Sequence, residues 1–360
     1  MAKLGDYVKI RTGKLDANAS SESGQYPFFT CAIEPLKIDS YSYDCECVLV
    51  AGNGDLNVKY YSGKFDAYQR TYIIESMDKT FLDVQYLYFF MDKYLETLRS
   101  QSIGGVIKYI KLGNLTEADI FIPSIERQRE IVQILRKSRE LISLRKQQLA
   151  KLDELVKARF VEMFGDPVVN SKRWSVETIE NHIDLLTGFP FDSSGYVSKG
   201  VNICGGLIIM PQKIDWSACK HWPQITGYED YILRPNDIVI ALDRPWISNG
   251  FKIAMVDREH LPALLIQRTA RIRAVDINQH YLMQSLLLGR FDKHCNITGS
   301  LVPHISPKDI KSYSVMIPPI ELQNQFATFA ERVDQEKRTV QQSLEKLELM
   351  KKVRMQEYFG

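Results

Sequence analysis

The chain contains an internal repeat, and this feature constrains its fold more than any other. The segment Ile122-Pro-Ser-Ile-Glu-Arg-Gln128 recurs 195 residues later as Ile317-Pro-Pro-Ile-Glu-Leu-Gln323. Shorter anchors recur in the same order: Thr12-Gly13 with Thr187-Gly188, Gln69-Arg-Thr71 with Gln267-Arg-Thr269, and Phe164-Gly165 with Phe359-Gly360. Because the order is kept throughout, we infer a tandem duplication in which each half holds a module of variable length and then one of fixed length.

The module of fixed length is predicted to be a long helix. Apolar residues recur every seven positions at Leu135, Ile142, Leu149, Val156 and Met163, and the second copy keeps this period at Phe326, Val333, Val340 and Leu347. Prolines precede both stretches, and neither has an internal Gly or Pro. We expect the two helices to pack antiparallel about a pseudo-twofold axis, as a coiled-coil-like spacer of about 35 residues and roughly 50 Å. Two independent amphipathic helices are the alternative.

The modules of variable length are predicted to be compact, loop-rich α+β domains. β-branched and aromatic residues favour strands at 26–31, 45–51, 70–75, 237–242 and 263–274, and helices are expected at 81–100 and 279–291. The chain thus divides into a first domain (1–123), a central helix (124–165), a second domain (166–318) and a C-terminal helix (319–360). Two similar heads on a rigid spacer suit a target with two separated half-sites, such as helical DNA.

Composition narrows the class of protein. A net charge of +2, with 25% charged and 45% hydrophobic residues, is typical of a globular protein and gives no argument for a polyanion partner. There is no long apolar run or signal core, so we expect a cytoplasmic protein with no membrane association. The six cysteines are expected to be reduced thiols, and Cys45-Glu-Cys47 lacks a second pair at zinc-site spacing. We find no motif for independent catalysis and predict no catalytic residue, metal or bound cofactor in this chain.

The duplicated helix start also carries a resemblance to a known family. Together with Leu4-Gly-Asp-Tyr-Val8, Gly52-Asn-Gly54 and Tyr60-Tyr-Ser-Gly63, the repeated Ile-Pro-x-Ile-Glu-x-Gln resembles the specificity (S) subunit of type I restriction-modification systems over essentially the full length. One departure is Leu322, where the first copy has Arg127. The resemblance implies two target-recognition domains that bind an asymmetric, bipartite site in double-stranded DNA.

The same resemblance implies the partners of the chain. A non-catalytic S subunit docks two modification subunits, which methylate adenine with S-adenosylmethionine, and restriction subunits join them to form a nuclease that uses ATP and Mg²⁺. The first predicted helix is basic, with ten Lys and Arg against four acids between Arg127 and Arg159. Its basic face is interpreted as a contact for DNA phosphates or for an acidic methylase helix, or as a plain solvated face.

The best candidate for DNA contact is the predicted strand 263–274. Alternation places Gln267, Thr269, Arg271 and Arg273 on one polar face, with Arg268 intruding on the apolar face. Arg suits guanine or phosphate and Gln suits adenine, although a solvated outer face is the alternative. The remaining candidates lie in loops of the first half (Asn53, Asn57, Lys59, Gln69, Arg70, Gly104, Lys108, Tyr109) and of the second (Arg244, Trp246, Asn249, Ser300, His304). Trp246 is equally suited to the core, and Gly104 to a turn.

Two other classes of function remain open. One is a non-enzymatic coiled-coil scaffold that joins two protein-binding heads, and the other is the specificity subunit of a related type IIB-like system. DNA affinity that falls with salt separates the scaffold from both specificity subunits.

Overall fold

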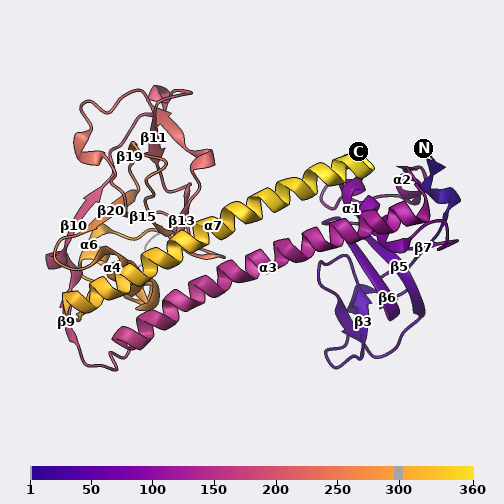
Figure 1. The fold of residues 1–360 in the computed structure, drawn as a ribbon, viewed down its shortest axis with the longest axis horizontal. Coiled ribbons are helices and arrows are strands. Elements are labelled where there is room, and N and C mark those ends of the chain that lie inside the picture. The colour runs from indigo at the N-terminus through magenta and orange to yellow at the C-terminus, as the bar shows by residue number, and fades with distance from the viewer. Residues whose placement is uncertain (1, 296–302) are drawn as a thin grey trace. The chain divides into compact units, whose positions relative to one another are not determined.

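A computed structural model describes residues 2–295 and 303–360, in two compact units (Figure 1). Unit 1 consists of Met1–Gln148 together with Val340–Gly360, and unit 2 of Leu149–Thr339. Two long helices, α3 (Ile125–Phe164) and α7 (Ile320–Phe359), each contribute one part to each unit. Each has 40 residues, somewhat more than expected. The predicted fold class, two sheet-containing domains with two long helices, is confirmed.

Unit 1 is built on one mixed sheet with the order β2-β7-β5-β6-β3-β4, covered by the helix α1. All neighbours in this sheet are antiparallel except β3 and β6. The elements are β1 (Ala2–Lys3), β2 (Val8–Thr12), β3 (Tyr26–Phe29), β4 (Leu36–Ile38), β5 (Tyr43–Ala51), β6 (Val58–Ala67), β7 (Thr71–Ser76), α1 (Val84–Gln101), α2 (Leu112–Thr116) and β8 (Asp119–Ile120). Strand β6 is not among the strands expected from the sequence, the nearest of which fall at 45–51 and 70–75 on either side of it.

Unit 2 repeats this topology with a larger insertion. Its central sheet has the order β10-β20-β15-β18, which matches β2-β7-β5-β6, and β11 and β19 form a parallel pair as β3 and β6 do. The elements are β9 (Ser175–Thr178), β10 (Ile183–Thr187), β11 (Val201–Cys204), β12 (Ile209–Met210), β13 (Lys213–Ile214), β14 (Lys220–Trp222), β15 (Ile238–Ala241), β16 (Trp246–Ile247), β17 (Gly250–Phe251), β18 (Ile253–Met255), β19 (Ala263–Leu265), β20 (Thr269–Ala274), α4 (Gln279–Leu288), α5 (Phe291–His294), α6 (Pro307–Lys311) and β21 (Ser314–Ile317).

Two predicted elements of unit 2 are wrong in detail. The predicted strand 263–274 breaks between β19 and β20, where Arg268 has a left-handed backbone (φ 64°). The predicted helix 279–291 ends at Leu288, and a short separate helix, α5, follows. In both places the backbone turns where the residue types alone favour continuation. Within the described residues, none of the helices is both long and apolar enough to cross a bilayer.

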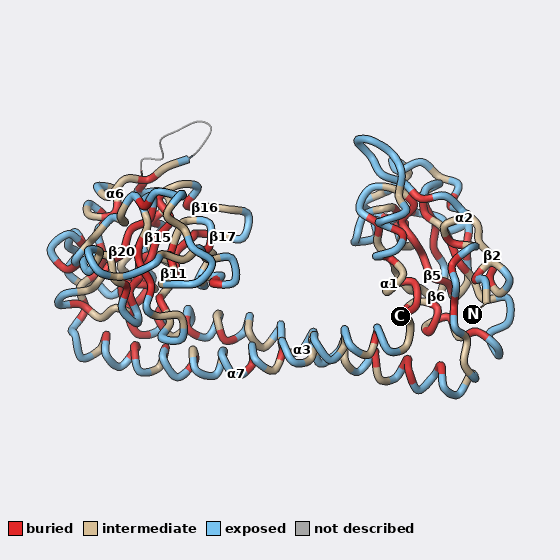
Figure 2. Tube along the Cα trace, turned by 90° about the horizontal axis from the view of Figure 1, so that it is seen from above, coloured by how far each residue is buried: buried red, intermediate tan, exposed pale blue. Residues whose placement is uncertain are grey.

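The long helices run antiparallel within each unit. In unit 1 the ammonium of Lys146 lies 2.9 Å from a carboxylate oxygen of Glu348, and Arg127, earlier on α3, lies over the ring of Tyr358, later on α7. In unit 2 Lys337 pairs with Asp153 at 2.6 Å. The heptad stripe is buried near the sheets, whereas every α3 side chain between Leu135 and Leu152 is exposed or half-buried (Figure 2).

The repeated glutamine at the start of each long helix ties that helix to its domain. Gln128 is fully buried; its Oε1 accepts from the amide of Asp83 at 2.9 Å, and its Nε2 donates to the carbonyls of Phe81 and Pro123, both at 2.8 Å. In unit 2 the amide of Asn278 donates to Gln323 Oε1 at 2.8 Å. Asp83 and Asn278 are also the N-caps of α1 and α4. Each glutamine therefore fixes one long helix against the first turn of a shorter one.

We predict that Gln128→Ala lowers the free energy of unfolding by about 1–3 kcal/mol, because the buried Gln128 side chain is lost and the amide of Asp83 and the carbonyls of Phe81 and Pro123 lose its three part-buried hydrogen bonds. Denaturant unfolding of the full chain measures this change. The matched control is Gln133→Ala, an exposed glutamine on the same helix, for which we expect a change within about 0.5 kcal/mol. Equal values for the two variants would contradict the role of Gln128.

Candidate nucleic-acid interface

In unit 1 a network of backbone hydrogen bonds brings several candidate residues together at one end of the sheet. The amide of Gly52 donates to Arg70 O at 2.7 Å, the amide of Gly54 to Lys108 O at 2.9 Å, and the amide of Ile110 to Gly52 O at 2.9 Å. We call residues 52–54, 68–70 and 103–110 loop cluster 1. It brings together candidates that are far apart in the sequence: Asn53, Gln69, Arg70, Gly104, Lys108 and Tyr109.

The same network of backbone hydrogen bonds recurs in unit 2. The amide of Leu242 donates to Arg268 O at 2.9 Å, the amide of Arg244 to Pro303 O at 2.7 Å, and the amide of Ile305 to Leu242 O at 3.0 Å. We call residues 242–244, 266–268 and 303–305 loop cluster 2. The two clusters share their backbone bonds but present different side chains.

Most side chains of loop cluster 1 are open to solvent. The exposed residues are Gln69, Arg70, Gly104, Lys108 and Tyr109, and Asn53 is half-buried. Gly104 has φ 119°, and a Cβ there would lie 2.4 Å from Ile107 O, so this position requires glycine for the turn itself.

Two further candidates of unit 1 are anchored side chains beside the cluster. Asn57 and Lys59 are both half-buried. Asn57 Nδ2 donates to Cys31 O at 2.8 Å, and the ammonium of Lys59 donates to Asn57 Oδ1. Burial lowers the pKa of Lys59. Asn57 and Lys59 therefore hold neighbouring loops in place.

Loop cluster 2 is organised around Asp243. Arg268 lies 3.1 Å from Asp243 Oδ2, and His304 Nδ1 lies 2.7 Å from Asp243 Oδ1. The Arg268 side chain is 73% exposed, which corrects the prediction that it intrudes on an apolar face. The left-handed backbone of Arg268, between β19 and β20, reverses the alternation of side chains along the strand. The repeat of Gln69-Arg-Thr71 pairs Arg268 with Arg70, which is exposed, and this was the signal in the sequence for an exposed Arg268. Asp243 was not among the predicted residues.

The other loop candidates of unit 2 lie in different settings. Arg244, Gln267 and Asn249 are exposed. Trp246 is half-buried and stacks on Phe251, with ring centroids 4.9 Å apart, which places it against the core. Ser300 lies outside the described residues.

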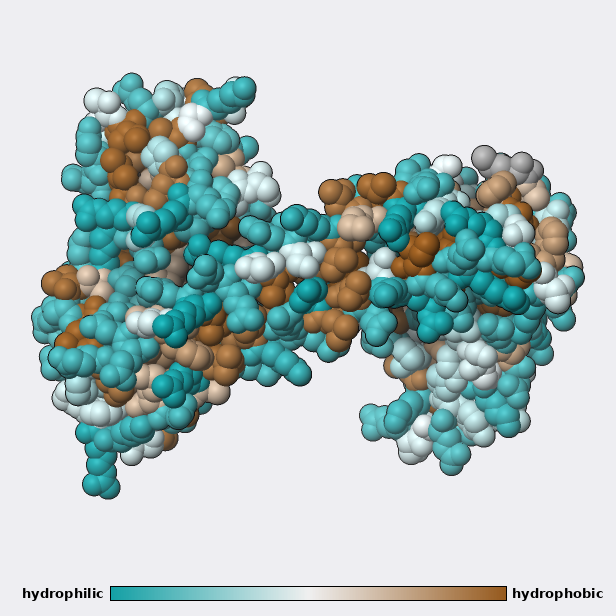
Figure 3. All heavy atoms as spheres, in the orientation of Figure 1, coloured by the Kyte–Doolittle hydropathy of each residue, from teal (hydrophilic) through white to brown (hydrophobic). Residues whose placement is uncertain are grey.

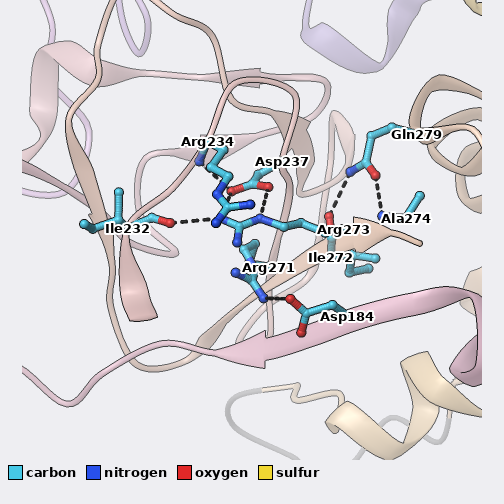
Figure 4. Close-up of polar contacts among 9 residues, drawn as sticks. All are labelled: Asp184, Ile232, Arg234, Asp237, Arg271, Ile272, Arg273, Ala274 and Gln279. Atoms are coloured by element: carbon cyan, nitrogen blue, oxygen red, sulfur yellow. Dashed lines mark hydrogen bonds and ion pairs between the residues drawn. The ribbon is translucent and has the colours of Figure 1, made fainter. Parts of the chain in front are cut away.

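The predicted polar face of the strand is wrong for Thr269, Arg271 and Arg273. Thr269 is fully buried, Arg271 is 4% exposed and pairs with Asp184, and burial lowers the pKa of Arg271. Arg273 forms two bonds to the Asp237 carboxylate, at 2.6 and 2.9 Å, and one to a carbonyl of the covering chain (Figure 4). The face is covered because β20 is a central strand and chain from the insertion between β10 and β15 folds over it. These three side chains are therefore placed to stabilise the domain.

We predict that Arg273→Ala destabilises the protein by about 3–5 kcal/mol, because it leaves Asp237, only 3% exposed, without the arginine of its ion pair. The matched control is Arg268→Ala, which removes a 73% exposed arginine from its pair with the half-buried Asp243 and is expected to cost less than about 1 kcal/mol. Chemical denaturation followed by tryptophan fluorescence compares the two variants. A loss for Arg273→Ala as small as that for Arg268→Ala would show that the pair does not support the fold.

Comparison with known sequences finds similarity to type I restriction specificity proteins. Residues 1–154 match the family model of the type I restriction modification DNA specificity domain. The chain is 37% identical over 155 residues to the type I restriction enzyme EcoDI specificity subunit of Escherichia coli, an alignment that covers 43% of this chain and 34% of that protein. It is 23% identical to the MjaVIII specificity subunit of Methanocaldococcus jannaschii over 363 aligned residues, 93% of this chain and 85% of the relative. The chain thus spans about a third of the first relative and most of the second.

Solved structures share the fold. The S subunit of a type I restriction-modification system from M. genitalium aligns with a TM-score of 0.64 at 15% identity, over 100% of this chain and 95% of that one. A chain from a structure on complex assembly and conformational transition of the type I restriction-modification system aligns with a TM-score of 0.53 at 15% identity. This alignment covers 99% of this chain and 96% of that one. The predicted resemblance to type I specificity subunits is confirmed.

Proposed function

We propose that this chain is the DNA specificity subunit of a type I restriction-modification complex, in which loop clusters 1 and 2 contact the two halves of an asymmetric, bipartite DNA site. The observation that carries the proposal is the hydrogen-bond network that recurs in both loop clusters while their side chains differ. Asn53, Lys108 and Tyr109 in unit 1 correspond to Asp243, Pro303 and His304 in unit 2. Two heads with the same frame and different base-reading groups suit two different half-sites.

Some exposed residues are the same in both heads. Gln69 and Arg70 recur as Gln267 and Arg268, and all four are exposed, so the fold does not require their side chains. The two half-sites differ in sequence but share a phosphate backbone. We therefore assign the two arginines to phosphate contacts and the unlike residues of each cluster to the bases.

The helices supply surfaces for the modification subunits. In unit 1 the two long helices expose five large apolar side chains: Leu141, Leu144, Leu349, Met350 and Val353. Figure 3 shows brown, hydrophobic atoms on the visible face of the helical segments. Exposed apolar residues near one another on a protein surface are typical of protein contacts. We assign two modification subunits to the helices, restriction subunits to the complex they form, and S-adenosylmethionine, ATP and Mg²⁺ to those partners. The chain itself is assigned no catalytic step.

Mapping adenine methylation across the host genome, with and without this gene, tests the function. We expect one bipartite sequence to lose its methylation when the gene is deleted and to regain it when the gene is restored. Methylation that does not change on deletion would contradict the proposal. A protein scaffold would leave the methylation unchanged, and a type IIB-like system would differ in its neighbouring nuclease genes.

We predict that Arg70→Ala and Arg268→Ala each weaken DNA binding by the assembled complex without changing the methylated sequence. Each variant loses about one phosphate contact, so the negative slope of log K against log salt becomes shallower by about 0.9. Titration of specific and non-specific duplexes at several salt concentrations measures this slope. Arg258→Ala removes an exposed arginine outside both clusters and serves as the control. A changed methylation sequence would instead assign the altered arginine to base contact.

A further inference from the structure

The loop that joins α1 to α2 carries two exposed aliphatic residues at its tip. Val106 is fully exposed and Ile107 is 62% exposed, and we call this pair the aliphatic tip. The residues of this loop singled out from the sequence are Gly104, Lys108 and Tyr109, which flank the pair. Adjacent aliphatic side chains in water are unfavourable, so their presentation on a surface indicates a contact.

The backbone holds this tip in a defined position. Ile103 and Tyr109 exchange hydrogen bonds, Ile103 N to Tyr109 O at 3.0 Å and Tyr109 N to Ile103 O at 2.8 Å. The chain reverses through Gly104, the position that only glycine fits. The tip is therefore presented by a closed loop, and little conformational freedom is lost when it binds.

The position of the tip identifies the chemistry of its target. The next residue, Lys108, is exposed and its carbonyl accepts from Gly54, which joins the loop to the rest of loop cluster 1. Arg70 is exposed in the same cluster. Cationic side chains beside the aliphatic tip are complementary to DNA, where phosphates flank thymine methyl groups and base faces.

The repeat gives a second, independent observation from the sequence. The offset of 195 residues pairs Val106 with Leu301 and Ile107 with Val302. Leu301 and Val302 lie outside the described residues. Both copies carry two aliphatic residues at these positions, although the flanking residues differ.

We propose that Val106 and Ile107 make apolar contacts with bases in the half-site contacted by unit 1. The inference rests on the proposed function and adds to it an apolar contact beside the polar ones. The base surface is either the methyl group of thymine or the face of a base exposed by local unstacking. Both are reached by the same aliphatic side chains.

The test uses the complex assembled with its modification subunits and a duplex that carries the methylated sequence. Val106→Ser and Ile107→Ser, singly and together, are compared with Val169→Ser, a 68% exposed valine in the loop after α3. We expect the double variant to bind specific DNA about tenfold more weakly, a change of about 1.4 kcal/mol. Val169→Ser is expected to bind as the unaltered complex does.

Two further measurements on the DNA identify the base surface. Replacing thymine with uracil in one half-site at a time removes only the methyl group, and 2-aminopurine placed along each half-site reports unstacking by a rise in fluorescence. A methyl contact makes uracil weaken binding of the unaltered complex but not of the double variant. A base-face contact makes the fluorescence rise disappear in the double variant. Either effect, confined to one half-site, supports the proposal.

Three outcomes overturn it. The first is a double variant that binds DNA like Val169→Ser, and the second is an absence of both the uracil and the 2-aminopurine effects. The third is normal DNA affinity with weakened assembly of the modification subunits, which would make the tip a protein contact. If the unaltered complex shows no sequence-specific DNA binding, the proposed function itself fails, and that result is distinct from all three.

Discussion

The fold depends on the way each unit is closed by both long helices. In unit 1 the start of α3 is held by Gln128, while the end of α7 places Phe359 against Tyr86, with ring centroids 5.1 Å apart. In unit 2 the start of α7 is held by Gln323, and the end of α3 places Phe164 against Tyr281 at 4.7 Å. Neither sheet-containing domain completes its core with its own helix alone, so the duplication is stable only when both helices are present.

The backbone forms the frame that both copies share, and exposed side chains form the surface that varies between them. The loop clusters are held by main-chain hydrogen bonds, which do not depend on the identity of the side chains. Side chains that the frame needs recur between copies. Thr71 and Thr269 are buried. The hydroxyl of Tyr86 donates to Phe121 O, directly after β8, at 2.7 Å, and that of Tyr281 donates to Met316 O in β21 at 2.8 Å. Exposed positions are therefore free to differ, and the proposed specificity lies there.

The sequence predicts those parts of the structure that depend on period and repetition. The seven-residue stripe predicts α3 and α7, and the repeated Gln69-Arg-Thr71 marks equivalent positions in the two halves. The structure of β20 could not be predicted in this way. Alternation assigned Arg271 and Arg273 to an open polar face for DNA contact, but their ion-pair partners, Asp184 and Asp237, lie 87 and 36 residues away along the chain. A strand pattern cannot show that a distant insertion covers a polar face.

The divergence between copies extends to the charges that the long helices present. In unit 1 a cleft of about 510 Å³ is lined in part by Tyr88, Arg136 and Arg139, and the Arg139 guanidinium lies 2.8 Å from Asp92. The repeat offset places Glu331 and Asp334 at the two arginine positions in unit 2.

The chemistry of these acidic positions is opposite to that of the arginines. Glu331 lies 3.4 Å from His280, and burial raises the pKa of Asp334. A cationic group suits the surface of unit 2, and an anionic group suits that of unit 1. Equivalent helix positions therefore present opposite charges, so a partner that docks on both copies cannot use the same charged contacts on each.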